Sequence, residues 1–205
     1  MSILNEEKLT ETYQVWHVYY PSGPPPFYSA MRVRDDINAL MTNLSSPQLY
    51  NQAIFIGHSM GGIITKTLVS RSGYALWDTT FRDRPETVLS SENDELAKIF
   101  IFEPIFKYNT AFFIDTPHRG STVADSFIGT LGAAVVSLPS RFKNIFKKLI
   151  DRVGVDVLTT AMLPFLENYG PTSVKVLRPG HPMMQALLNL PVDGQFYSVI
   201  GTNKT

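Results

Sequence analysis

One serine in this sequence stands in a setting suited to nucleophilic chemistry. Ser59 lies in the pattern Gly-His-Ser-Met-Gly, residues 57–61, directly after the apolar run at residues 53–56 and before a stretch, residues 61–70, that we expect to be helical. A serine on a strained turn between a strand and a helix presents its hydroxyl at the carboxyl end of a parallel sheet, where such folds bind ligands. The pattern therefore predicts that Ser59 is a nucleophile that attacks carbonyl carbons.

The neighbours of this serine fit the geometry that such a turn requires. Gly57 and Gly61 leave out the Cβ atoms that would collide where strand and helix meet, and Gly62 extends this room. The backbone N–H of Met60 is expected to donate to the oxyanion of a tetrahedral intermediate. A phosphate-binding loop would need a lysine after its last glycine, and Ile63 stands there instead. An ordinary glycine-rich turn with an inert serine is the remaining alternative.

Hydrophobic patterning predicts the elements that must position this turn. An aromatic and β-branched stretch at residues 13–20 predicts a buried strand, stopped by a proline-rich loop, and helical spacing predicts a helix over residues 30–44. Apolar runs at residues 111–114 and 195–200 predict further strands, and the run at residues 53–56 is expected to be a central one. This order predicts an α/β fold with a mostly parallel sheet flanked by helices.

The length of 205 residues favours a single domain. Residues 71–108 are mixed and polar, and we expect them to form an excursion from the core. Residues 109–121 are expected to supply a strand and the loop after it. Amphipathic spacing predicts further helices over residues 122–138, 140–153, 155–169 and 181–190.

Composition excludes several classes of partner and site. Hydrophobic residues make up 44% of the chain and eighteen basic residues balance eighteen acidic ones, which indicates a packed globule that does not bind nucleic acid. The absence of cysteine excludes disulfides and a thiol nucleophile, and no side chains have metal-ligand spacing, so we expect no cofactor or metal. The longest apolar stretch, residues 127–138, is too short to span a membrane, and residues 1–12 do not resemble a signal peptide. We expect a soluble protein, cytoplasmic by default.

Four segments resemble the lipase and esterase branch of the α/β-hydrolases. The Gly-His-Ser-Met-Gly-Gly turn is similar to the nucleophile elbow of that branch, and Thr-Pro-His-Arg-Gly-Ser at residues 116–121 resembles the segment after its next strand. Residues 19–23 resemble the strand and loop before the elbow in some bacterial members, and residues 182–201 the stretch before their catalytic acid. The resemblance covers about residues 13–201. It implies hydrolysis of small-molecule or lipid esters through an acyl-enzyme on Ser59.

The chain departs from that family at both ends. Members place a strand and a His-Gly loop, which donates the second oxyanion N–H, before the segment that begins here at Tyr13. They place the catalytic aspartate and then the catalytic histidine after the strand that ends here at Gly201. The resemblance therefore implies a central fragment of an enzyme, poor in activity alone and inclined to self-association through open sheet edges. The alternative is a non-catalytic binding module that keeps the central part of the fold.

Two side chains after the elbow are the internal candidates for completing a catalytic triad. His118 is a candidate base, although in similar lipases this histidine is not the base, and hydrogen bonding at the pocket wall is its alternative role. Asp115 is a candidate acid, with a cap on its own turn as the alternative. His58, inside the elbow, is expected to pack beside the turn. Residues 127–136, in a lid-like region over residues 122–170, resemble a lid over an acyl pocket, with a buried core helix as the alternative.

Overall fold

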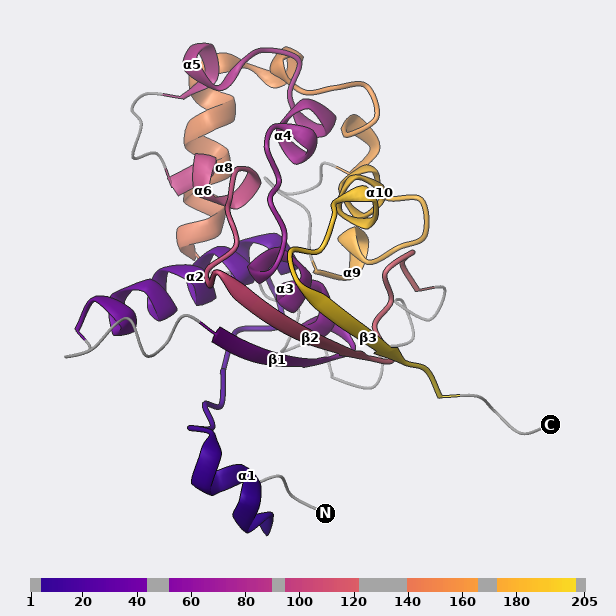
Figure 1. Ribbon diagram of the computed structural model, residues 1–205. Coiled ribbons are helices and arrows are strands. Elements are labelled where there is room, and N and C mark those ends of the chain that lie inside the picture. Colours follow the sequence, from indigo (N-terminus) through magenta and orange to yellow (C-terminus); the bar gives the residue numbers. More distant parts are fainter. Residues whose placement is uncertain (1–4, 44–51, 90–94, 122–139, 166–172, 202–205) are drawn as a thin grey trace.

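A computed structural model describes residues 5–43, 52–89, 95–121, 140–165 and 173–201. Figure 1 shows a small sheet with most of the helices stacked on one side of it. Its strands are β1 (Gln52–His58), β2 (Tyr108–Ile114) and β3 (Gln195–Val199), in the order β1-β2-β3, and both pairings are parallel. The fold is therefore α/β, with a three-stranded parallel sheet flanked by helices.

The helices of the described residues are mostly short. They are α1 (Glu7–Thr12), α2 (Pro26–Thr42), α3 (Met60–Leu68), α4 (Ala75–Thr80), α5 (Pro85–Val88), α6 (Glu95–Phe100), α8 (Ser140–Val153), α9 (Ser173–Val176) and α10 (Pro182–Asn189). Two 3-10 turns, η4 (Val155–Val157) and η5 (Leu163–Phe165), lie between α8 and α9. No helix in these described ranges is long and apolar enough to cross a membrane.

The two longest helices near the elbow pack against each other. The helix expected over residues 30–44 is α2, which begins earlier, because Pro26 at its first position has a backbone conformation already suited to a helix. A small hydrophobic cluster joins α2 to α3, and it consists of Ala30, Val33, Ile37, Ile64 and Leu68. Helix α2 therefore supports the helix that follows Ser59.

Residues 71–108 do not form the excursion from the core that their polar composition predicts. They contain α4, α5 and α6, and they supply many side chains of the largest buried hydrophobic cluster. In it Trp77, Phe81 and Phe100 pack ring against ring, with centroids 4.3 to 5.9 Å apart. The prediction is wrong because helices of four to six residues are too short to show a hydrophobic period in the sequence.

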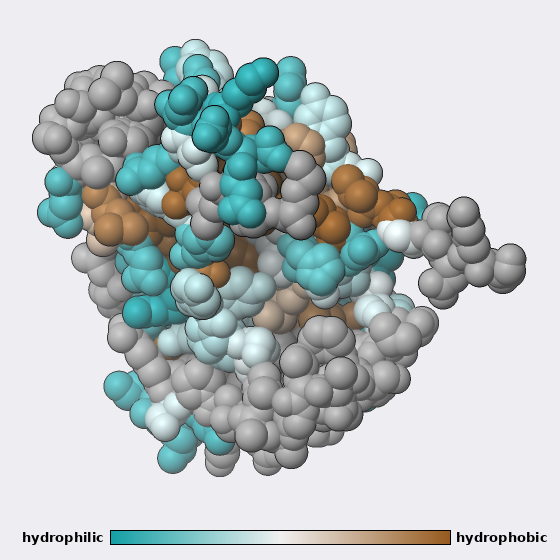
Figure 2. Space-filling view, turned by 90° about the horizontal axis from the view of Figure 1, so that it is seen from below, coloured by the Kyte–Doolittle hydropathy of each residue, from teal (hydrophilic) through white to brown (hydrophobic). Residues whose placement is uncertain are grey.

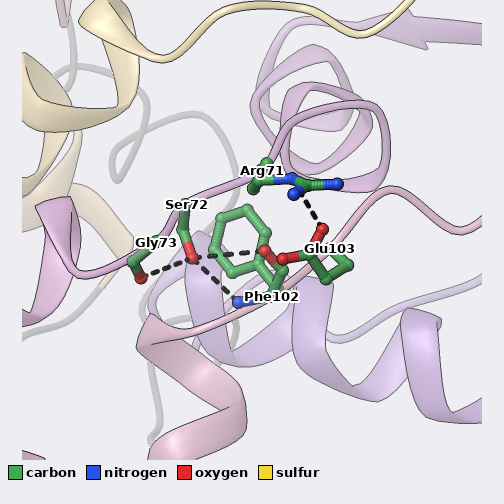
Figure 3. Close-up of polar contacts among 5 residues, drawn as sticks. All are labelled: Arg71, Ser72, Gly73, Phe102 and Glu103. Carbon is green, nitrogen blue, oxygen red and sulfur yellow. Dashed lines mark hydrogen bonds and ion pairs between the residues drawn. The ribbon is translucent and has the colours of Figure 1, made fainter.

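Polar contacts join the two ends of this region (Figure 3). Ser72 Oγ accepts a hydrogen bond from the Phe102 N–H at 2.8 Å, and the same hydroxyl lies 3.1 Å from the Gly73 carbonyl oxygen. On the surface, Arg71 Nε and the Glu103 carboxylate form an ion pair at 2.8 Å. The chain therefore leaves the end of α3 and returns to the start of β2 at nearly the same place.

The two faces of the sheet differ in what covers them. On the helix side, Ala111 and Phe113 of β2 are fully or almost fully buried. On the other face, Ile54 and Ile56 of β1 are 48% and 52% exposed. Figure 2 views the molecule from below, and hydrophobic residues are visible at its surface there.

Strand β1 is an edge strand of the described sheet, and β2 is the central one. This corrects the expectation that residues 53–56 form a central strand. An apolar run is compatible with burial on both faces but does not require it, since the strands and helices around it decide what is covered.

The strand expected over residues 13–20 is absent, and this segment is irregular. Several of its side chains are exposed, among them Tyr13, Val18 and Tyr19. An extended segment becomes a strand only where a neighbouring backbone satisfies its N–H and C=O groups, and within the described residues β1 pairs with β2 alone. The high β-propensity of residues 13–20 was therefore not sufficient to form a strand.

The amphipathic stretch at residues 155–169 is also not a helix in its described part. Gly154, with φ of 76°, ends α8, and η4 and η5 follow as single turns. Pro164 lacks the N–H that a continuing helix needs, and Leu158 instead forms an isolated antiparallel bridge with Phe81. The expected helix over residues 122–138, including the lid-like residues 127–136, lies outside the described residues.

Candidate active site

Ser59 occupies a strained turn between β1 and α3. Its backbone has φ of 52° and ψ of −124°, a conformation that residues with a Cβ rarely adopt. The turn is held from two sides: the Ser59 N–H donates to the Ile114 carbonyl at 2.9 Å, and the Ser59 carbonyl accepts from the Gly62 N–H at 3.0 Å. The first contact ties the turn to β2 and the second begins the helix.

The Ser59 hydroxyl is not used to hold this turn together. Ser59 is the N-cap residue of α3, yet its side chain makes no capping hydrogen bond, and the residue is half-buried. The Met60 N–H opens the helix, where amides have no acceptor within the helix itself. A carbonyl oxygen placed at this point would meet a free donor and the positive end of the nine-residue helix.

The three glycines of the elbow make room for different neighbours. A Cβ at Gly57 would lie 2.5 Å from Thr65 Oγ1 and within 2.7 Å of the backbone of α3. A Cβ at Gly62 would lie 1.8 Å from Thr116 Oγ1. At Gly61 a Cβ would lie 3.1 Å from the Tyr20 hydroxyl, and outside the adjoining backbone no other atom of the described residues comes within 4 Å. Gly57 thus permits the close packing of α3 on β1 and Gly62 that of α3 on the loop after β2, whereas Gly61 faces a tyrosine.

Asp115 follows β2 directly and has φ of 44°, a left-handed conformation that aspartate tolerates. Its N–H donates to the Val199 carbonyl at 2.8 Å, and its Oδ1 accepts from the Gly201 N–H at 2.6 Å. The carboxylate therefore ties the end of β2 to the segment after β3. This contact differs from both roles that the sequence suggests for Asp115. It is neither a cap on the residue's own turn nor the contact of a triad acid with a histidine.

His118 lies in the loop after β2 and is half-buried. Its ring packs edge-on against Phe113, with centroids 4.8 Å apart and an interplanar angle of 81°. Burial, and in second place the charge of Lys66, lowers the pKa of His118 below its ordinary value of 6.5. Within the described residues no hydrogen bond joins His118 to Ser59 or to Asp115. The candidate base therefore packs on Phe113 of β2 and has no hydrogen bond to the nucleophile within the described residues.

His58, expected to pack beside the turn, has an exposed side chain at the end of β1. His181, which the sequence does not mark as a site residue, is fully buried and caps α10, with Nδ1 accepting from the Met183 N–H at 3.3 Å. Burial lowers the pKa of His181 to about 4, so that the neutral ring needed for this cap persists at neutral pH.

Lys66 is a feature that sequence reasoning missed. It lies about two helical turns after Ser59 on α3, it is buried, and its Nζ donates to the Leu188 carbonyl at the end of α10 at 2.8 Å. Burial lowers the pKa of Lys66 to about 8. The nearly continuous apolar character of α3 was the signal that this helix is buried on all sides, its lysine included.

No group of side chains in the described ranges could hold a metal ion. Comparisons with known proteins add no assignment: a scan against family models, a search of curated proteins and a search of solved structures each found no match. The chemistry of the site must therefore be argued from the residues around Ser59.

Proposed function

We propose that this chain carries the nucleophile of a serine hydrolase of the α/β-hydrolase type, which acts on carboxylic esters of small molecules or lipids. The observation that supports this most directly is the Ser59 conformation. A backbone held at positive φ costs about 1–3 kcal/mol for a residue with a Cβ, and glycine would occupy the same turn without that cost. A serine that bears this strain, and whose hydroxyl makes no hydrogen bond within the described residues, is better explained by chemistry than by folding.

The proposed reaction begins when Ser59 Oγ bonds to the ester carbonyl carbon and gives up its proton to a base. The carbonyl electron pair moves onto oxygen, which accepts a hydrogen bond from the Met60 N–H. Collapse of this intermediate breaks the bond to the alcohol, which leaves with a proton, and water then hydrolyses the acyl-enzyme to restore Ser59.

His118 is the candidate base within this chain. Its lowered pKa keeps the imidazole neutral, and so able to take a proton, at pH 7. Asp115 takes no part in the proposed step, because its carboxylate accepts from the Gly201 N–H and makes no hydrogen bond to His118 within the described residues.

A binding module without turnover is the second candidate. One observation favours it: Ser59, His118 and Asp115 are not hydrogen-bonded to one another in the described part of the chain.

Hydrolysis of p-nitrophenyl butyrate and labelling by a fluorophosphonate probe distinguish the two candidates. Ser59→Ala should lower turnover by about 10³-fold or more and abolish labelling. Ser198→Ala, a change at an exposed serine on β3, should leave both unchanged. Ordinary turnover in Ser59→Ala would refute the proposed nucleophile. A folded wild-type chain that is neither labelled nor active would favour the binding module, whereas strong labelling lost in His118→Gln would identify the base.

A further inference from the structure

The position of Tyr20 relative to the elbow is set by helices on both sides. Tyr20 ends the irregular segment before α2 and packs against the cluster that joins α2 to α3. The next residue is anchored to α2, because the Ser29 hydroxyl donates to the Pro21 carbonyl at 2.8 Å. Tyr20 is therefore held in place although it belongs to no strand.

The Tyr20 hydroxyl points at the first turn of α3. It lies 3.1 Å from the place that a Cβ on Gly61 would take, next to Met60 in the chain. Within the described residues this hydroxyl makes no hydrogen bond. Burial raises the pKa of Tyr20 above its ordinary value of 10.0, so the phenol remains protonated, and able to donate, at neutral and mildly alkaline pH.

We propose that the Tyr20 hydroxyl is a second oxyanion donor, acting beside the Met60 N–H. This inference rests on the proposed function and assigns a second donor of its catalytic step. As Ser59 Oγ bonds to the carbonyl carbon, the negative charge that develops on oxygen accepts hydrogen bonds from both donors, and Tyr20 keeps its proton throughout. Gly61 then has a specific reason to be glycine, since a Cβ there would lie 3.1 Å from the hydroxyl and push it a few tenths of an ångström away.

Tyr20→Phe tests this role, because it removes the hydroxyl and keeps the ring that packs on α2 and α3. We expect kcat for p-nitrophenyl butyrate to fall about 10²–10³-fold, with KM and the melting temperature almost unchanged. The matched control is Tyr19→Phe, at a neighbouring residue that is 91% exposed, and it should retain wild-type kcat. An unchanged kcat in Tyr20→Phe, or a loss matched in Tyr19→Phe, would overturn the inference.

Gly61→Ala supplies a second, independent test. Its added methyl group should displace the hydroxyl and lower kcat in the wild-type background, but it should have little further effect in a Tyr20→Phe background. Losses that multiply in the double variant would show that Gly61 and Tyr20 act separately, against the inference. Failure of the proposed function is recognised separately: a normal rate in Ser59→Ala removes both proposals. A normal rate in Tyr20→Phe combined with an inactive Ser59→Ala removes only the role of Tyr20.

Discussion

Substituting alanine at Gly57 should destabilise the fold, whereas the same change at Gly61 should not. An added methyl group at Gly57 meets Thr65 Oγ1 at 2.5 Å and two backbone atoms of α3, Gly61 O and Gly62 Cα, at 2.6 and 2.7 Å. Backbone atoms of a packed helix cannot rotate away, so α3 must shift relative to β1. Overpacking of this kind costs about 1–3 kcal/mol, of which the lower entropy of the unfolded alanine chain returns about 0.5–1 kcal/mol.

The net loss at Gly57 should therefore be up to about 2.5 kcal/mol, which lowers the melting temperature by up to about 10 °C in a chain of this size. At Gly61 the one atom of another described segment that the methyl group meets is a side-chain hydroxyl, at 3.1 Å. Alanine also gains up to about 1 kcal/mol of helix propensity over glycine. The melting temperature of Gly61→Ala should equal or exceed that of the wild type.

Thermal and urea unfolding followed by circular dichroism measure both variants under identical conditions. The comparison is internally controlled, because the two glycines flank the same serine and receive the same methyl group. Gly57→Ala melting as high as Gly61→Ala would refute the close crossing of α3 over β1. A large loss of stability in Gly61→Ala would refute the open, tyrosine-facing environment at that position.

Two buried titrating side chains predict how stability depends on pH. Burial lowers the pKa of His181 to about 4, so as the pH falls this histidine is protonated in the unfolded chain before it is protonated in the folded one. The free energy of unfolding of the wild type should therefore fall by up to about 3 kcal/mol between pH 6.5 and 4. His181→Asn, which keeps an N-cap acceptor, should remove most of this loss in urea unfolding, and an unchanged profile would contradict the buried neutral cap. Burial lowers the pKa of Lys66 to about 8, so in the unfolded chain this lysine stays protonated to a higher pH than in the folded chain. Lys66 should therefore make the free energy of unfolding rise from pH 8 to 10. Lys66→Met should flatten that rise, whereas the control Lys147→Met, at an exposed lysine, should not. Equal stability profiles in the two variants would refute the role of the buried Lys66 amine.

The local order of the elbow was accessible from the sequence because short-range sterics decide it. An apolar run of β-type residues, a turn rich in glycine and an apolar helix follow one another at residues 53–70, and the structure has β1, Ser59 at positive φ and α3 in that order. The helix after the proline-rich loop and the strands around residues 111–114 and 195–200 were also predicted from local signals, since the helix has its own period and each strand its own apolar run.

Pairing and burial were not accessible in the same way. Residues 13–20 have the composition of a strand but no pairing within the described sheet, and residues 71–108 look polar but supply the rings of Trp77 and Phe100 to the core. A strand depends on hydrogen bonds to another segment, and a helix of four to six residues depends on packing, so neither leaves a complete signal in its own residues.

The sequence alone determined that Ser59 stands on a glycine-flanked turn between a strand and a helix, because the apolar run, the glycines and the start of the helix all lie within a few positions of it. Only the tertiary structure decided what surrounds the serine. Tyr20 reaches the first turn of α3 because α2 holds its loop, and Asp115 contacts Gly201 because β2 and β3 pair in one register. Contacts between residues 41 to 86 positions apart depend on how the elements pack, which local propensity does not specify.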